Sequence, residues 1–227
     1  MPLYFQSTKG ASAIKSGIDL FSLSFIVAPF AIIAGATIGA TGHYLAHNYL
    51  GWVFSLVGFG TLSVLGADSG TAMWAGFTVI VGIGLGLLYS ATNFPVLAPL
   101  QPNQQPAAMG FFNFARSLGQ VFGIAIGNTV LTNQLHKKLP AAFLAAHGAS
   151  AEAAIPYITT LAEPLRHEVR VAYAESLQTV WYVMVGIAGL GLVSVFMMKS
   201  LPLTVEVDER WGLEEREKRA DLEGGRV

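Results

Sequence analysis

The chain has 227 residues, of which 53% are hydrophobic and only 12% are charged, and it contains no cysteine. Soluble domains average about 25% charged residues, so a soluble protein of this composition would lack the charge to cover its surface. The formal net charge of −1 argues against a nucleic-acid-binding protein, which usually presents a basic face. The absence of cysteine excludes a disulfide scaffold, a thiolate zinc site and a cysteine nucleophile.

Charged residues are concentrated at the C-terminal end. The last 29 residues, Lys199–Val227, carry six basic and eight acidic side chains, whereas positions 1–198 carry the other 13 charges. This division predicts a membrane domain followed by a charged tail at 199–227. Residues 1–17 lack the basic region, apolar core and cleavage site of a signal peptide, and we expect them to form an extramembrane N-terminal segment.

Five apolar stretches have nearly the length, about 20 residues, that a helix needs to cross about 30 Å of hydrocarbon. A transmembrane β-barrel would instead show strands of about 10 residues with alternating polarity. The sequence therefore predicts an all-α polytopic membrane protein with about five transmembrane helices. Four of them lie within 18–131 and the last lies at 177–198. Their expected ranges are Ile18–Ala40, Tyr49–Ala67, Ala72–Leu100, Ala107–Leu131 and Leu177–Met198.

The connections between these stretches predict their directions. Residues 41–48, 68–71 and 101–106 form short loops, which force neighbouring helices to run antiparallel. Residues 132–176 form one long connection, which we expect to lie outside the membrane. Asp19 is the only charge of the first stretch, and we interpret it as a helix N-terminal cap in preference to a proton carrier.

Polar side chains interrupt the third and fourth stretches. Tyr89 and Asn93 precede Pro95, which frees a backbone carbonyl and can bend the helix. At 100° per residue, the fourth stretch places three polar residues within about 60° of one another. A polar stripe inside a membrane lines a substrate path or bonds neighbouring helices to each other. Both interpretations stand for the arginine, and interhelical bonding is favoured for the amides. The substrate-path candidates are Tyr89, Asn93, Asn113, Arg116 and Gln120.

Glycines recur at four-residue spacing, which is typical of close helix packing in membranes but also of the general abundance of glycine there. The predicted packing positions are Gly35, Gly39, Gly82, Gly86, Gly119, Gly123 and Gly127. Catalytic motifs are missing: there is no phosphate-binding loop and no nucleophile elbow. His43 and His47 lie four residues apart without an acid beside them. We therefore predict no enzyme activity, no catalytic residue, no metal site and no cofactor.

Three segments together resemble a known family. Residues 2–20 (PLYFQSTKGASAIKSGIDL) are similar to the junction after the first helix of the C-terminal half of major facilitator superfamily (MFS) transporters. Residues 82–95 (GIGLGLLYSATNFP) and 106–128 (PAAMGFFNFARSLGQVFGIAIGN) resemble the third-last and second-last spans of the fourteen-span drug:proton antiporter branch, in its fungal form. The resemblance covers residues 2–198.

The resemblance implies a C-terminal portion of a proton-coupled drug or toxin efflux transporter. It places the tail and the loops 41–48 and 101–106 in the cytoplasm, and the long connection outside. It makes the third stretch a cavity-lining helix and residues 1–17 the end of a further helix. The implied partners are the lipid bilayer, a small organic substrate and protons, with no nucleic acid. An N-terminal half would be needed for transport, since alternating access moves two halves around a midplane site.

The plasma membrane is expected in preference to the vacuolar membrane. The alternative function is that of a non-transporting membrane interaction protein, or a truncated or degenerate copy, which assembles through glycine-lined helix faces.

Overall fold

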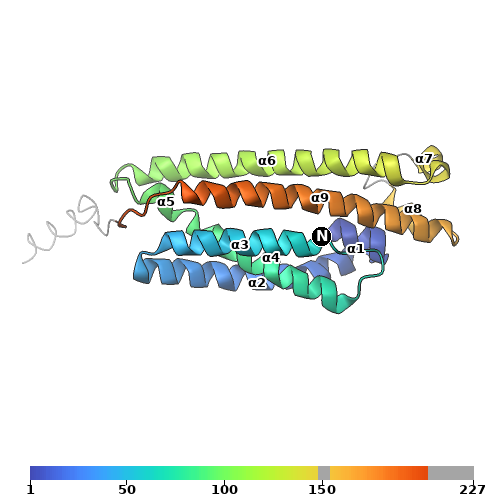
Figure 1. Ribbon diagram of the computed structural model, residues 1–227, viewed down its shortest axis with the longest axis horizontal. Coiled ribbons are helices and arrows are strands. Elements are labelled where there is room, and N and C mark those ends of the chain that lie inside the picture. Colours follow the sequence, from blue (N-terminus) through green and yellow to red (C-terminus); the bar gives the residue numbers. More distant parts are fainter. Residues whose placement is uncertain (148–153, 204–227) are drawn as a thin grey trace, which may run out of the picture.

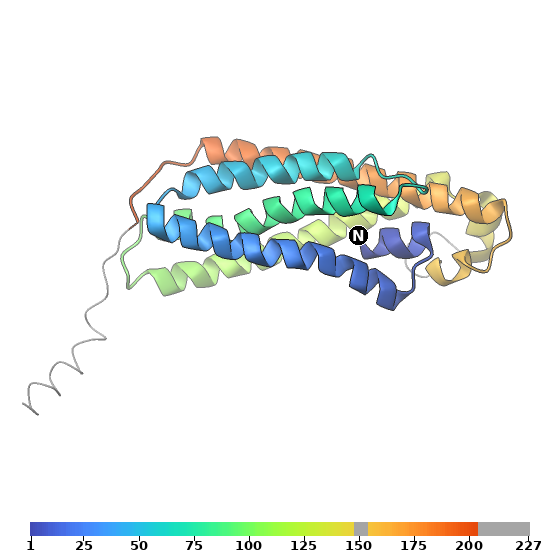
Figure 2. The same cartoon turned by 90° about the horizontal axis from the view of Figure 1, so that it is seen from below.

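The computed structural model describes residues 1–147 and 154–203, and the regular secondary structure of that part is entirely helical. Five long helices lie side by side along one axis and form an elongated bundle (Figures 1 and 2). Short helices lie at its two ends. The elements are α1 (Pro2–Lys9), α2 (Ala13–Thr41), α3 (Tyr44–Leu62), α4 (Thr71–Ala91), α5 (Phe94–Leu97), α6 (Gln105–Lys138), α7 (Ala141–His147), α8 (Ile155–Ile158) and α9 (Leu165–Phe196).

Each predicted apolar stretch coincides with one long helix, but the boundaries differ. Helix α3 begins at Tyr44, because Gly42 ends α2 with a left-handed φ of 72° and the chain turns at once. Helices α6 and α9 extend into the predicted long connection, which is therefore reduced to residues 139–164 and contains α7 and α8. The predicted tail beyond residue 203 lies outside the described residues.

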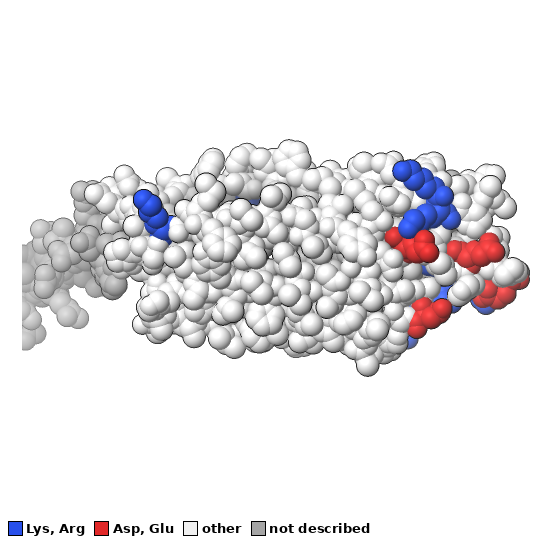
Figure 3. Space-filling view, in the orientation of Figure 1, with Lys and Arg blue, Asp and Glu red and all other residues white. Residues whose placement is uncertain are grey.

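Hydropathy supports membrane insertion. Three segments of the described chain are long and apolar enough to cross a bilayer: Ala13–Thr41, Thr71–Leu97 and Leu165–Phe196. That α3 and α6 also span the membrane stays a prediction. On the face drawn in Figure 3, most charged side chains gather at the end where α7 and α8 lie, and the surface along the middle of the bundle is largely uncharged. The long apolar faces are thus free for lipid or other helices.

Helix α4 lies at the centre of the packing, with α3 and α2 as its closest neighbours. Glycine makes these contacts possible. A Cβ placed on Gly84 would lie 2.6 Å from the backbone nitrogen of Ser55, and one on Gly86 would lie 2.7 Å from the carbonyl oxygen of Val27. Helix α9 covers the other face of α3, where a Cβ on Gly191 would lie 2.5 Å from the Trp52 ring. Helix α6 packs mainly on α9.

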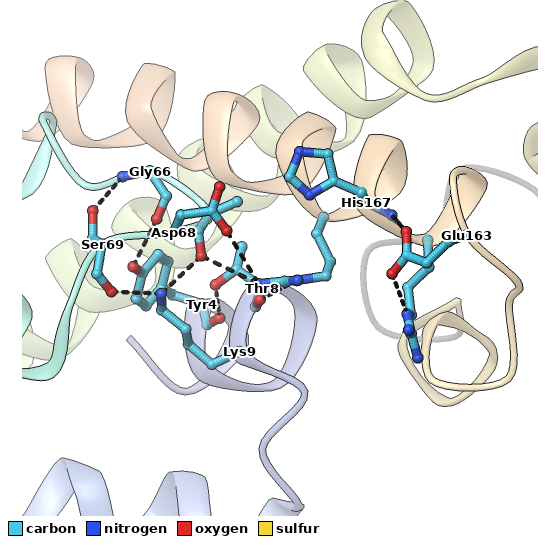
Figure 4. A network of polar contacts seen from close by, with 11 residues as sticks. Tyr4, Thr8, Lys9, Gly66, Asp68, Ser69, Glu163 and His167 are labelled. Carbon is cyan, nitrogen blue, oxygen red and sulfur yellow. Dashed lines mark hydrogen bonds and ion pairs between the residues drawn. The ribbon is translucent and has the colours of Figure 1, made fainter.

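A polar network ties this charged end of the bundle together (Figure 4). The Lys9 ammonium donates hydrogen bonds to the carbonyl oxygens of Ala67 (2.7 Å) and Ser69 (2.6 Å). Arg170 on α9 donates to Thr8 of α1 (2.6 Å) and also to Ala67 (3.3 Å). Burial, with a smaller contribution from the nearby Arg170 charge, lowers the pKa of Lys9. The two cations therefore join α1, the α3–α4 loop and α9.

The interpretation of Asp19 as a cap is wrong. Helix α2 begins six residues earlier, at Ala13, and its N-cap is Ser12, whose hydroxyl oxygen accepts a hydrogen bond from the Lys15 amide at 3.2 Å. A serine side chain satisfies one of the free amides of the first turn as well as a carboxylate does. Asp19 consequently lies inside the helix.

The substitution Gly84→Ala tests the central packing. A methyl group there meets backbone atoms of α3, which cannot rotate away, so we expect a loss of about 1–3 kcal/mol in the free energy of unfolding. The matched control is Gly76→Ala on the same helix, where a Cβ meets nothing within 4 Å. That variant should unfold like the parent or be stabilised by about 0.5–1 kcal/mol. Thermal unfolding in lipid nanodiscs measures both, and equal effects would contradict the packing.

Candidate functional site

Helix α4 breaks within the apolar segment Thr71–Leu97. It ends at Ala91, Thr92 and Asn93 follow, and the short helix α5 resumes at Phe94. Pro95 causes the break, because it has no N–H group to donate to the carbonyl oxygen of Ala91 four residues earlier. Inside a bilayer a carbonyl without a donor costs several kcal/mol, since no water is present to replace the missing bond. The carbonyl of Ala91 therefore needs a donor from another helix.

Asn48 of α3 supplies that donor. Its side-chain nitrogen lies 3.0 Å from the carbonyl oxygen of Ala91 and 3.0 Å from that of Tyr44, and the side chain is fully buried. The expectation that Asn48 lies in a loop is wrong, because α3 already begins at Tyr44. Its burial could have been found from the small residues that follow it on the same helical face at Gly51, Ser55 and Gly58. Without Asn48 this face would be purely a packing surface.

Two further side chains secure the last turn of α4. The Ser90 hydroxyl donates to the carbonyl oxygen of Ala31 at 2.7 Å and so joins α4 to α2. The Asn93 amide nitrogen donates to the carbonyl oxygens of Tyr89 (3.1 Å) and Ser90 (3.2 Å), both in the last turn of α4. Asn93 therefore satisfies carbonyls at the helix end and keeps only its amide oxygen as a free acceptor within the described residues.

Arg116 reaches the same turn from α6. One guanidinium nitrogen donates to the carbonyl oxygen of Tyr89 (3.2 Å) and to the Thr92 hydroxyl (3.0 Å). The guanidinium also lies over two rings, 5.1 Å from the centroid of Tyr89 and 4.8 Å from that of Phe112. Cations are attracted to ring faces, most strongly where water is excluded. A cation at the C-terminal end of α4 also interacts favourably with the helix dipole.

Arg116 keeps capacity for a further partner. A guanidinium carries five N–H donors, and the bonds described above come from one nitrogen. The Tyr89 side chain is 61% exposed beside it. A charged donor group, an exposed aromatic ring and the Asn93 amide oxygen thus lie together where the chain leaves a face uncovered. This combination can bind an aromatic molecule that carries a carbonyl or an anionic group.

The other two predicted path residues flank Arg116 on α6, Asn113 about one turn before it and Gln120 about one turn after it. Asn113 and Gln120 are exposed and make no hydrogen bond to the rest of the described chain. The structure therefore brings Tyr89, Asn93 and Arg116 into one cluster. Asn113 and Gln120 are exposed on α6 and make no contact of this kind with the cluster. Thr92 and Phe112 complete the cluster; their roles depend on contacts between helices that the sequence alone does not specify.

The predicted packing glycines fall into two groups. Gly82 and Gly86 lie against α2, where an added Cβ would come within 2.8 Å of Ile26 or Val27, and Gly35 lies opposite Ser90. The others have space beside them in the described chain. A Cβ on Gly127 would just reach Val180 at 4.0 Å, and one on Gly39, Gly119 or Gly123 would meet nothing within 4 Å.

The pairing of Asn48 with Pro95 can be tested by rescue. Asn48→Leu leaves the carbonyl of Ala91 without a donor and should lower the free energy of unfolding by about 1–3 kcal/mol. Pro95→Ala restores a backbone N–H that can reach this carbonyl, so the double variant should regain part of the loss. Unfolding in nanodiscs measures all four combinations. If the two substitutions are simply additive, Asn48 does not compensate for the proline.

The chain is similar to fungal membrane proteins over nearly its whole length. It is 33% identical over 98% of its residues to MFS transporter L2 of Phoma sp. and 33% identical over 95% to efflux pump FUS6 of Gibberella moniliformis. It is 30% identical over 95% to MFS-type efflux pump MMF1 of Pseudozyma antarctica. The chain spans 38%, 40% and 41% of these three relatives, about two fifths of their length. No family profile matches it, and neither does any solved structure.

Proposed function

We propose, from the sequence matches that confirm this chain as part of the major facilitator superfamily, that it forms the C-terminal portion of a transporter that exports small organic molecules across a membrane. The observation that carries the proposal is Arg116. A guanidinium inside an apolar bundle is costly, and such residues mark substrate or ion pathways by default. Arg116 is only partly used by the protein and lies beside an exposed aromatic ring.

The substrate would contact the cluster at the end of α4. The Tyr89 ring offers a stacking surface, Arg116 offers free N–H donors, and the Asn93 amide oxygen accepts a hydrogen bond. Asn113 and Gln120 would extend the path along α6, where both are exposed. This chemistry favours amphiphilic molecules with a ring and a carbonyl or anionic group, because a purely apolar molecule would leave the arginine donors unpaired.

The remaining parts of the proposal follow the antiporter resemblance. Export would be coupled to protons, and we assign that coupling to no residue of this chain. A further region, equivalent to the N-terminal half, would supply the other side of the cavity. The α2–α3 and α5–α6 connections and the charged tail would face the cytoplasm, residues 139–164 would face outward, and the plasma membrane would be the site of action.

The substitution Arg116→Ala tests the proposal in the transporter that contains this chain. We expect the export rate of a fluorescent anionic amphiphile to fall about tenfold or more, because a hydrogen bond to a charged group contributes about 1.5–3 kcal/mol. Arg116→Lys keeps the charge but loses the planar group over the two rings. Its export rate should therefore lie between those of the parent and of Arg116→Ala. The measurement is substrate efflux from cells, normalised to the amount of transporter at the membrane.

Arg166→Ala is the matched control. Arg166 forms an exposed ion pair with Glu163 at 2.8 Å, far along the chain from the break in α4. Exposed pairs of this kind contribute about 0–1 kcal/mol, so export should be unchanged. Normal export by Arg116→Ala, at normal membrane abundance, would remove Arg116 from the transport path.

A second candidate function is that of a membrane interaction protein that does not transport. Gly119 and Gly123 favour it, because they form an open, small-residue strip on α6 that no described helix covers. Such strips allow close helix association in lipid. Crosslinking from a Gly123→Cys variant would separate the candidates: capture of a separate membrane protein, with no export by the chain-containing transporter, supports the second.

A further inference from the structure

The segment that follows α9 returns to the bundle and is fastened there. Tyr44, in the first turn of α3, is 1% exposed. Its hydroxyl oxygen accepts a hydrogen bond from the Leu201 amide at 2.8 Å and donates one to the Lys199 carbonyl at 3.2 Å. We name residues 199–203 the C-terminal strap. It leaves α9 at the end of the bundle where α5 lies (Figure 1).

Apolar contacts hold the strap as well. Leu203 packs on a small cluster of buried side chains that comes from α2, α3, the end of α4 and the residue after α5. The cluster consists of Ile38, Tyr44, Ala91 and Ala98. The strap therefore covers the position where the broken end of α4 meets its two neighbouring helices.

A continuous set of bonds joins the strap to the candidate site. Tyr44 binds the strap through its hydroxyl, and its carbonyl oxygen accepts a hydrogen bond from Asn48. The same Asn48 nitrogen donates to Ala91, the last residue of α4. Tyr89 lies in that last turn and Thr92 directly follows it, and both accept hydrogen bonds from Arg116. Displacing the strap therefore changes the support of the whole junction.

We propose that the C-terminal strap is a latch that holds the broken end of α4 in position through Tyr44 and Asn48. When the strap is attached, the Tyr44 hydroxyl has two partners inside the protein. When it detaches, that buried hydroxyl loses both and must be reached by water, because burying it unpaired is costly. Detachment thus opens this end of the bundle and loosens the last turn of α4. The latch deepens the proposed function, and rests on it only for what the junction does in transport.

Single thiols report both ends of this connection, because the chain contains no cysteine. Leu203→Cys reports the strap. Ser90→Cys, a nearly isosteric change that faces α2, reports the last turn of α4. The reaction rate of each thiol with a water-soluble maleimide is measured on the chain in lipid nanodiscs. Both positions are half-buried while the strap is attached. Each thiol should therefore react faster when the fraction of molecules with that position open increases.

Tyr44→Phe removes both strap bonds with little change in volume. We expect it to raise the labelling rate about tenfold at position 203, and to raise the rate at position 90 in the same direction. The matched control is Tyr49→Phe on the same helix, whose hydroxyl makes a single 3.4 Å bond to Val195 of α9. That variant should change neither rate.

Leu201→Pro repeats the test from the strap side. It removes the amide N–H that donates a hydrogen bond to the Tyr44 hydroxyl. It changes no residue of the helices, so it remains informative if Tyr44→Phe does not fold. A rise at both positions in this variant supports the latch. A rise at position 203 alone overturns it, because the strap would then move without affecting α4, and unchanged rates at both positions overturn it too. If Arg116→Ala exports normally while both labelling rates rise as expected, the proposed function fails and the latch stands.

Discussion

The carbonyl of Ala91 is the constraint on which the functional end of this protein depends. Pro95 deprives it of its donor in the helix, and an apolar surrounding supplies no water in exchange. Asn48 resolves this by a bond from α3. That single bond fixes the register between α3 and α4 at their ends, and it fits the close packing below, where Gly84 lies against Ser55. The end of the broken helix therefore has a defined position, because its free backbone carbonyl is bonded to another helix.

The break joins four helices, α2, α3, α4 and α6, around one turn. Ser90 binds α2, Asn48 joins α3 to the end of α4, and Arg116 arrives from α6, which otherwise packs mainly on α9. Interhelical bonding and substrate binding are thus combined at one place. The same arginine that links α6 to α4 retains free donors and lies over two rings, so it can serve both purposes with different atoms.

The two ends of the bundle differ in how they are stabilised. At one end, Lys9 and Arg170 saturate the carbonyls of the α3–α4 loop, and charged residues are gathered there. At the other, the closing element is the uncharged contact of Tyr44 with the C-terminal strap. An end held by charged donors resists opening, because hydrogen bonds from a charged group are roughly twice as strong as neutral ones. An end held by two neutral hydrogen bonds opens at a lower cost, which suits an element that changes state.

Composition and apolar stretches determined the helical membrane character of this chain, the place of each long helix and the break before Pro95. They suffice because a bilayer admits few structures and because proline disrupts any helix locally. The sequence also singled out Arg116, since a charge in an apolar stretch is conspicuous. Tertiary structure decided what these residues contact. Asn48 lay in a predicted loop, Asp19 was taken for a cap that Ser12 provides, and the attachment of the strap to Tyr44 joins residues more than 150 positions apart. Such pairings depend on which helix faces meet, and the periodicity of one segment contains no information about its neighbour.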